Sequence, residues 1–144
     1  MKLLFATLAL LCAQLGFSQS AKNTQVERRR YLVQRVGMCG DCHTPRDEKG
    51  VPIPGKELSG APIDFKPLQP MPWASTAPEI AGLPGWKDEE VVSFLMTGKL
   101  NGKQPSPPMP GYRFSALDAR SVVAYLRSLG AAAAAGKKDA LKAK

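Results

Sequence analysis

The stretch Cys39-Gly40-Asp41-Cys42-His43 decides how the rest of this sequence is interpreted. Two thiols stand three positions apart, and an imidazole follows the second thiol directly. His43 is the only histidine among the 144 residues, and Cys12 is the only other cysteine. Any chemistry of this chain that needs an imidazole must therefore take place at this stretch.

Residues 1–20 have the pattern of a secretory signal peptide. A short positive start, Met1-Lys2, is followed by an almost wholly apolar run over residues 3–15 and then by small residues. The apolar run is shorter than a transmembrane helix requires, which disfavours an uncleaved anchor. We expect cleavage near Ser20 and export from the cytoplasm, so that Cys12 leaves with the signal peptide.

An exported chain meets an oxidising compartment, where the two remaining thiols would oxidise unless they are bonded to another group. A disulfide between them would close a very small loop and would stabilise the protein little. Zinc needs further ligands that the mature chain lacks, and a thioredoxin-type pair belongs in a βαβ unit, of which the sequence shows no sign. The pattern C-x-x-C-H is typical of c-type haem attachment, in which each thiol adds to one vinyl group. The sequence therefore predicts one haem c, bound covalently through Cys39 and Cys42, with His43 as an iron ligand.

Methionine is the natural second iron ligand, because there is no second histidine and a soft thioether favours ferrous iron. Met38 lies too close to the cysteine motif to reach the opposite haem face. Met96 lies on an apolar segment with helical spacing, and we expect its side chain in the protein core. Met71 and Met109 both stand between two prolines, which stiffen a loop. Spacing does not choose between these two. We favour Met109, because a well-capped helix follows it and can fix the direction of its loop.

Three segments have the apolar spacing and the capping residues of helices. They cover residues 24–38, 88–97 and 116–129. We expect Gly98 to end the second helix and Gly130 to end the third, because glycine readily adopts the left-handed conformation found after helix ends. Residues 131–144 form an Ala/Lys-rich tail of low complexity, for which we expect a solvated extension.

The segment between the first two helices, residues 44–86, holds nine prolines and five glycines and shows no sustained period. We expect no strands there. A connection of this length is uncommon in a compact domain, and three short helices bury too little apolar area to offset the ordering entropy. Both difficulties disappear if the loop packs on haem. We therefore expect haem to be part of the core and the haem-free chain to be largely unfolded.

The chain is basic, with 20 Lys and Arg against 12 Asp and Glu and a formal net charge of +8. A basic exported protein favours an acidic partner or an anionic surface. No interleaved run of aromatic and basic residues indicates nucleic-acid binding. We expect lysines to ring the haem edge and to steer an acidic redox partner, with these candidates: Lys49, Lys56, Lys66, Lys87, Lys99 and Lys103.

Four segments resemble, in this order, the class I or mitochondrial-type cytochromes c, in the bacterial form found as small periplasmic carriers and as haem domains attached to dehydrogenases. They are Cys39–Pro45, Gly85–Glu90, Pro107–Pro110 and Ala124–Leu129. The resemblance covers Val26–Leu129 and implies an all-α cytochrome c fold over residues 21–130. Three main helices, the first and last of them crossing, and long Pro/Gly-rich loops would surround one covalently attached haem. His43 and Met109 would hold the iron.

The resemblance also implies finer contacts. A proline carbonyl should orient the haem histidine, and Pro52 and Pro54 are the candidates. Trp73 and Trp86 are candidates to donate their ring N–H groups to haem propionates, although ordinary aromatic packing explains them equally well. Relatives often open the middle helix with serine or threonine, and here we expect Asp88 to cap it instead.

The function that follows is one-electron transfer by a periplasmic monohaem cytochrome c, a carrier rather than a catalyst. Two alternatives stay open. As a tightly bound electron-transfer subunit of a periplasmic dehydrogenase or oxidase, the isolated chain should expose an apolar patch. A haem enzyme or gas sensor would need an open or displaceable axial position, and it is disfavoured because no catalytic constellation is visible.

Overall fold

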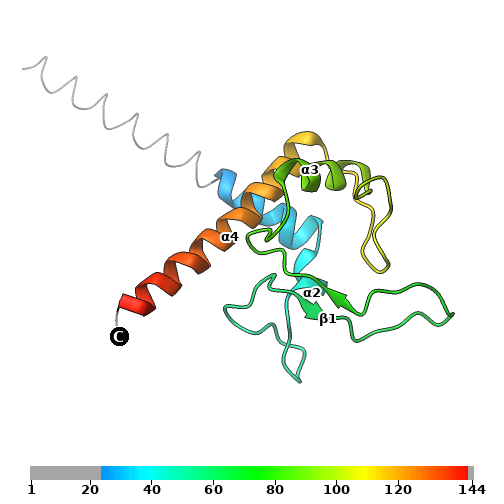
Figure 1. Cartoon of the computed structure of the whole chain (residues 1–144), viewed down its shortest axis with the longest axis horizontal. Coiled ribbons are helices and arrows are strands. Elements are labelled where there is room, and N and C mark those ends of the chain that lie inside the picture. Colours follow the sequence, from blue (N-terminus) through cyan, green and yellow to red (C-terminus); the bar gives the residue numbers. More distant parts are fainter. Residues whose placement is uncertain (1–23, 143–144) are drawn as a thin grey trace, which may run out of the picture.

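The computed structural model describes residues 24–142, and beyond residue 131 it describes the backbone alone. The expected signal peptide over residues 1–20 lies outside the described residues. Figure 1 shows helices gathered on one side and long loops projecting from the other. The elements are η1 Leu32–Val36, α2 Cys39–His43, β1 Ala61–Pro62, β2 Thr76–Ala77, α3 Asp88–Thr97 and α4 Ala116–Lys142. Within the described part of the chain, no helix has the length and apolar character to cross a membrane.

The N-terminal helix of the described chain runs over residues 24–36, and its last five residues form the π-helical turn η1. The predicted end at Met38 is two residues late. Gly37 closes the turn, because its N–H donates to the carbonyl oxygen of Leu32 at 2.8 Å. Met38 then takes a positive φ of 48°, which turns the chain into α2. The cysteine motif therefore begins a separate short helix.

The predicted middle helix is confirmed as α3, but it begins in a different way from the one we expected. The carboxylate of Glu90 accepts a hydrogen bond from the backbone N–H of Lys87 at 3.2 Å. Asp88 instead accepts a hydrogen bond from the guanidinium of Arg127 at 2.8 Å. Asp88 therefore ties α3 to α4, and the prediction that it caps α3 is wrong.

Of the two glycines expected to end helices, Gly98 does so with a φ of 68°, and Gly130 does not. Helix α4 continues through Gly130 into the tail at residues 131–144 and ends at Lys142. A Cβ at position 130 would lie 2.4 Å from the Cα of Gly82. Position 130 thus carries no side chain because two backbones meet there. The alanines that follow favour helix.

The long segment at residues 44–86 contains the two short strands, which the sequence analysis did not predict. Strands β1 and β2 pair antiparallel, with Ala61 opposite Ala77, so the mostly helical fold includes a small sheet. The segment also brings Leu58 and Leu83 into the core, with exposed fractions of 0% and 2%. Part of the loop therefore packs on protein side chains, and another part lines the cavity described below.

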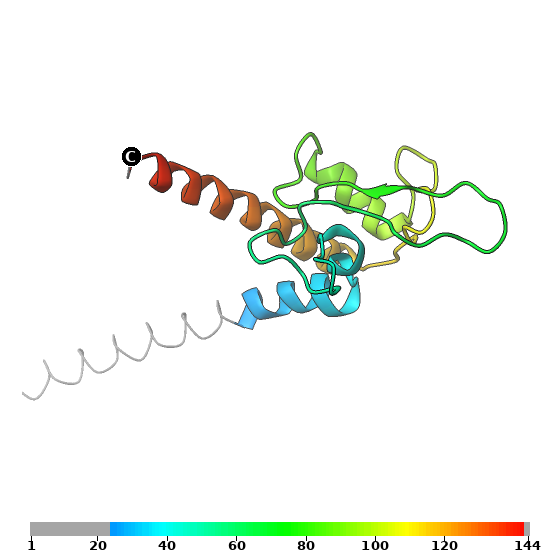
Figure 2. The same ribbon diagram turned by 90° about the horizontal axis from the view of Figure 1, so that it is seen from below.

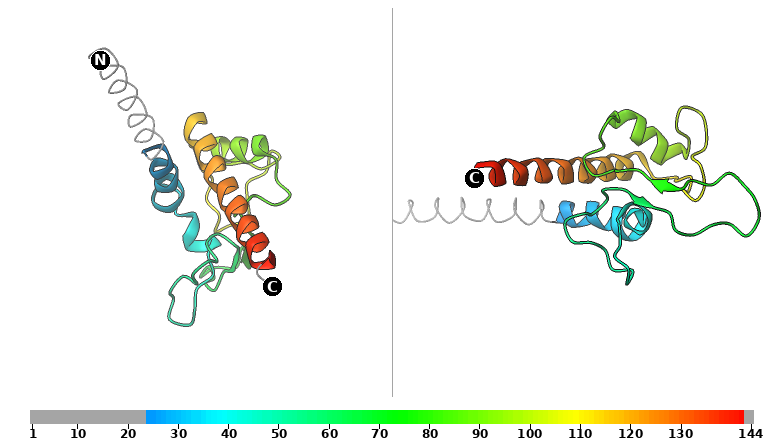
Figure 3. Two further views of the ribbon diagram at one scale, coloured as in Figure 1. Left: turned by 90° about the vertical axis from the view of Figure 1, so that its left-hand side faces the viewer. Right: turned by 60° about the horizontal axis from the view of Figure 1, so that its bottom comes forward.

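The core lies where α4 contacts both α3 and the N-terminal helix, as Figures 2 and 3 show. This contact confirms that the first and last helices pack together. The buried apolar side chains at its centre come from all three helices and from the long segment. They are Leu32, Val33, Leu58, Leu83, Val91, Leu95, Ala119, Val122, Val123 and Leu126.

Arg127 of α4 holds the irregular segment before α3 against the helix. Its Nη1 donates to the carbonyl oxygens of Gly82 and Leu83 at 2.6 and 3.0 Å. Its Nη2 donates to the carbonyl oxygen of Trp86 at 2.5 Å. One guanidinium thus satisfies three carbonyl groups of a segment that has no helix or sheet bonds of its own.

Candidate haem site

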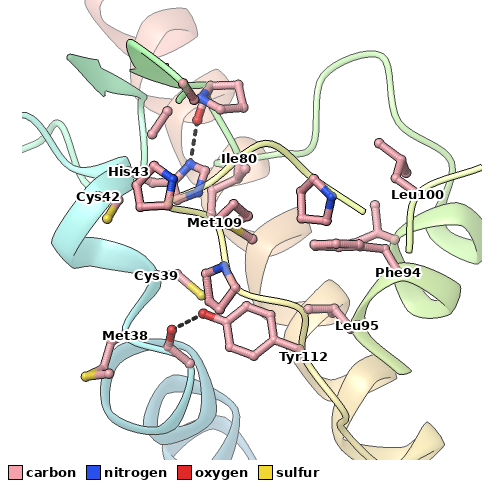
Figure 4. Close-up of a pocket in the computed structure, with 18 of the residues that line it drawn as sticks. Met38, Cys39, Cys42, His43, Ile80, Phe94, Leu95, Leu100, Met109 and Tyr112 are labelled. Carbon is pink, nitrogen blue, oxygen red and sulfur yellow. Dashed lines mark hydrogen bonds between the residues drawn. The ribbon is translucent and has the colours of Figure 1, made fainter. Parts of the chain in front are cut away.

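An apolar cavity of about 560 Å³ opens between α2, α3, α4 and the loops around them. Its apolar lining includes Leu83, Val122 and Leu126. Ile80, Phe94, Leu95 and Leu100 belong to the same lining and are labelled in Figure 4. Cys39, Cys42 and His43 stand along one wall of the same cavity. Cavities of this size and polarity suit a large apolar ligand. Two thiols and an imidazole on the wall fit a covalently attached haem.

Helix α2 presents the thiols as a single helical turn. Cys39 and Cys42 are three positions apart, so in a helix they lie on neighbouring parts of one face. Both thiols are free, and burial raises the pKa of the Cys39 thiol to about 11. The end of α2 is held by Thr44, whose hydroxyl oxygen accepts the backbone N–H of Leu58 at 3.0 Å. The motif is therefore attached to the buried core at its C-terminal end.

The His43 ring is buried, with an exposed fraction of 5%. Its Nδ1 lies 2.7 Å from the carbonyl oxygen of Pro78, to which Nδ1–H donates. Burial lowers the pKa of His43, and the hydrogen bond to Pro78 opposes that shift. A neutral ring that donates from Nδ1 keeps the Nε2 lone pair available to a metal. The expectation that Pro52 or Pro54 orients this histidine is wrong, because Pro78 does so.

The four candidate methionines lie in different surroundings. Met109 lines the cavity together with the thiols and His43 (Figure 4). Met71 is 50% exposed and does not line the cavity. Met96 is 39% exposed, so the expectation of a core position is wrong. Met38 borders the cavity, but its side chain is 58% exposed and it directly precedes α2.

The loop that carries Met109 is held by one hydrogen bond within the loop and by one to a neighbouring segment. The N–H of Met109 donates to the carbonyl oxygen of Ser106 at 3.3 Å, within the loop itself. The carbonyl oxygen of Pro107 accepts the N–H of Ala74 at 2.7 Å, which joins the loop to the segment leading into β2. Both prolines beside Met109 line the cavity as well.

The two tryptophans differ in their surroundings. The ring N–H of Trp73 donates to the carbonyl oxygen of Phe65 at 3.0 Å, and the two rings meet edge to face at 5.8 Å. This contact does not support a role for Trp73 at a haem propionate. Trp86 does line the cavity, as a residue beside bound haem must.

Sequence reasoning missed Tyr112 and Arg127. Tyr112 lines the cavity, and its hydroxyl donates to the carbonyl oxygen of Gly37. Burial raises the pKa of the Tyr112 hydroxyl well above its ordinary value. The only signal in the sequence is an aromatic residue three positions after Met109, and nothing local identifies a backbone carbonyl as its partner.

The family model described as cytochrome c matches residues 33–130. The chain therefore belongs to the cytochrome c family. The mostly helical fold with its small sheet is compatible with the fold of that family. The match includes α2, the cavity walls and the Met109 loop.

Several curated relatives are named as cytochrome subunits of dehydrogenases. The chain is 33% identical over 121 residues to the fructose dehydrogenase cytochrome subunit of Gluconobacter japonicus, covering 80% of this chain and 24% of that protein. It is 30% identical to the cytochrome c subunit of the quinone alcohol dehydrogenase of Gluconobacter oxydans strain 621H, covering 81% and 26%. It is 32% identical to the gluconate 2-dehydrogenase cytochrome c subunit of Pantoea cypripedii, covering 81% and 29%. The chain thus spans only 24–29% of the length of these relatives.

Proposed function

We propose that this chain carries single electrons through one haem c attached to Cys39 and Cys42, with His43 and Met109 as the two iron ligands. The cavity is the observation that carries the proposal. It gathers both thiols, the only imidazole of the chain and a thioether on apolar walls. When bound, haem supplies an iron that alternates between the ferric and ferrous states.

Each side chain of the site has a distinct part in this proposal. The bond to Pro78 holds the His43 ring by Nδ1, which leaves Nε2 for the iron. The Met109 thioether favours ferrous iron and so raises the reduction potential. The apolar side chains around them limit the access of water, which also controls the potential. With an imidazole and a thioether both given to the iron, the chain would carry electrons rather than catalyse a reaction.

We also propose that residues 1–20 are removed on export, that residues 21–130 form the cytochrome domain and that the protein works in the periplasm. The N-terminal pattern supports this placement. The intact mass of protein purified from the periplasmic fraction tests it. A mass that still includes the leader would contradict the proposed cleavage.

Visible absorption spectra test the ligand pair. Wild type, Met109→Ala and Met71→Ala would be produced in a host with working cytochrome c maturation, and their oxidised and reduced spectra compared. We expect Met109→Ala to lose the thioether-to-ferric-iron band and to shift toward high spin, with Met71→Ala unchanged as the matched control. Loss of the band in Met71→Ala instead would overturn the assignment.

A haem enzyme or gas sensor would need an axial position that an external ligand can take easily. We expect the reduced wild-type protein to bind carbon monoxide weakly and slowly at neutral pH, because Met109 occupies that position. Fast, tight binding to the wild type would favour the enzyme or sensor.

One exposed loop favours a second candidate function, in which the chain is a tightly bound electron-transfer subunit of a dehydrogenase. Residues 63–75 project from the molecule between β1 and β2 (Figure 1). Phe65, Leu68 and Met71 in this loop are 49%, 100% and 50% exposed. The loop is ordered by the contact of Trp73 with Phe65 and begins and ends beside the cavity. We propose that it docks on a dehydrogenase protein close to the haem.

Size-exclusion of a native periplasmic extract separates the two functions. A free carrier elutes at its own mass, and a subunit elutes with dehydrogenase activity. In the subunit case we expect Leu68→Ser to release the cytochrome from that fraction. Leu117→Ser is the matched control, because Leu117 is 72% exposed on α4 and lies outside the loop. Equal release by both variants would contradict docking through the loop.

A further inference from the structure

We propose that Tyr112 is the positioning residue that keeps the Met109 loop closed against the haem-attachment segment. This inference rests on the proposed ligation of iron by His43 and Met109. The observation behind it is the hydrogen bond from the Tyr112 hydroxyl to the backbone carbonyl of Gly37, drawn in Figure 4. The two residues are 75 positions apart in the sequence.

The carbonyl of Gly37 accepts this hydrogen bond on the side of the cavity where Cys39 and Cys42 lie. It is buried and closes the N-terminal helix, where carbonyl groups have no partner within the helix. Cys39 follows two residues later. A Cβ on Gly37 would lie 3.2 Å from the Cys39 Sγ, so the chain is tightly packed at this point. The tyrosine hydroxyl therefore satisfies a buried carbonyl directly beside the first attachment thiol.

Tyr112 donates this hydrogen bond from the segment that follows Met109. It stands three residues after Met109 and lines the same cavity. Its ring stacks on Phe114, with centroids 5.2 Å apart and an interplanar angle of 28°. The N–H of Phe114 donates to the carbonyl oxygen of Leu95 in α3 at 3.0 Å. The ring is thus placed by α3, and its hydroxyl reaches across to the end of the N-terminal helix, two residues before α2 begins.

The consequence concerns how easily Met109 leaves the iron. Opening the loop far enough to admit another ligand would pull Tyr112 from Gly37 and leave a buried carbonyl without a partner. A hydrogen bond of this kind favours the closed loop about tenfold, which equals about 1.4 kcal/mol. Removing the hydroxyl should therefore let an external ligand compete with Met109 more successfully.

Imidazole titration of the ferric, haem-containing full chain tests this. We expect Tyr112→Phe, which removes one oxygen and keeps the ring, to bind imidazole about tenfold more tightly than wild type. The thioether-to-ferric-iron band should weaken in the same variant. Tyr125→Phe is the matched control, because Tyr125 packs against the core without lining the cavity. Imidazole affinity of Tyr112→Phe equal to that of Tyr125→Phe would overturn the proposal.

A double variant separates a positioning role of the Tyr112 hydroxyl from a general contribution to the stability of the fold. In Met109→Ala there is no thioether to displace, so adding Tyr112→Phe should leave imidazole affinity unchanged. A tenfold effect in both backgrounds, or a loss of stability in Tyr112→Phe with unchanged imidazole affinity, would make the hydroxyl merely structural and overturn the proposal. Failure of the proposed ligation looks different, because Met109→Ala would then have the spectrum of wild type.

Discussion

Gly82 and Gly130 lie in backbone contact, although 48 positions separate them in the sequence, and this contact leaves no room for a side chain at position 130. Their backbones approach so closely that a Cβ on Gly130 would lie 2.4 Å from the Gly82 Cα. Real Cβ atoms do not tolerate such a distance, and both contact partners are backbone that cannot swing aside. The contact lets the segment before α3 lie directly on α4, where Arg127 binds its carbonyl groups.

Gly130→Ala should therefore destabilise the folded protein by about 1–3 kcal/mol, as overpacking does. In a helix without such a contact the same exchange stabilises by up to about 1 kcal/mol, so the sign of the change is diagnostic. Equilibrium denaturation of the haem-containing protein measures it. Ser128→Ala, an exposed change on the same helix, is the control. A gain in stability for Gly130→Ala would contradict the close contact.

At the scale of elements, Arg127 joins α4 to α3 and to the segment between Gly82 and Trp86. We expect Arg127→Met to cost about 2–3 kcal/mol, because it leaves several carbonyl groups without their donor and keeps the apolar stem. Arg28→Met is the control. It breaks only an exposed ion pair with Asp118 at 2.8 Å, which contributes roughly 0–1 kcal/mol. Urea denaturation compares the two, and equal costs would contradict the part given to Arg127.

The helices could be predicted because their signals are local. The Ser115 hydroxyl, for example, accepts the N–H of Asp118 at 3.1 Å, which is a contact within one turn. The length of α4 and the choice of Pro78 depend on contacts between distant segments instead. Nothing near Pro78 in the sequence distinguishes it from the other prolines of residues 44–86. The two short strands are likewise set by the pairing of separate segments.

The candidate site likewise combines residues with a local sequence signal and residues placed by contacts between distant segments. Cys39, Cys42 and His43 could be predicted as a group because they are contiguous in sequence. The preference for Met109 over Met71 used an argument about loop support, and the structure brings Met109 to the cavity with His43. Tyr112 could not be found, because its partner is a backbone carbonyl rather than a recognisable side chain.

At the scale of the whole molecule, an apolar cavity of about 560 Å³ sits inside a small fold. Its walls are apolar, so a haem bound there would bury apolar surface that the helices alone leave facing water. We therefore expect the folded state to depend on the bound haem.

We expect the double variant Cys39→Ser/Cys42→Ser, which cannot attach haem, to lose most of its helical circular dichroism. Met71→Ala, made in the same host, should keep both haem and helix. Far-ultraviolet circular dichroism of the purified proteins measures the difference. Full helical signal in the haem-free variant would show that the protein side chains alone suffice for folding.

The basic charge of the chain, formally +8 with Lys2 of the proposed leader included, should guide encounters with anionic redox partners. Lys99 and Lys103 are exposed on either side of Leu100, which lines the cavity. We expect oxidation of the ferrous protein by ferricyanide to slow as salt rises, because salt screens the attraction. At low salt, Lys99→Glu/Lys103→Glu should reduce the oxidation rate more than Lys49→Glu/Lys56→Glu does. The second pair makes the same change of charge at two further candidate lysines whose sequence neighbours do not line the cavity. A rate independent of salt would contradict steering by charge.

Covalent attachment of one haem through Cys39 and Cys42, with His43 as an iron ligand, is the basis of the proposed function. The most direct measurement is the amount of haem that stays with the polypeptide after full denaturation, for protein made in a host with working cytochrome c maturation. We expect one haem per chain in wild type and none in Cys39→Ser/Cys42→Ser. Colourless wild-type protein, or haem that separates from the chain on unfolding, would contradict it.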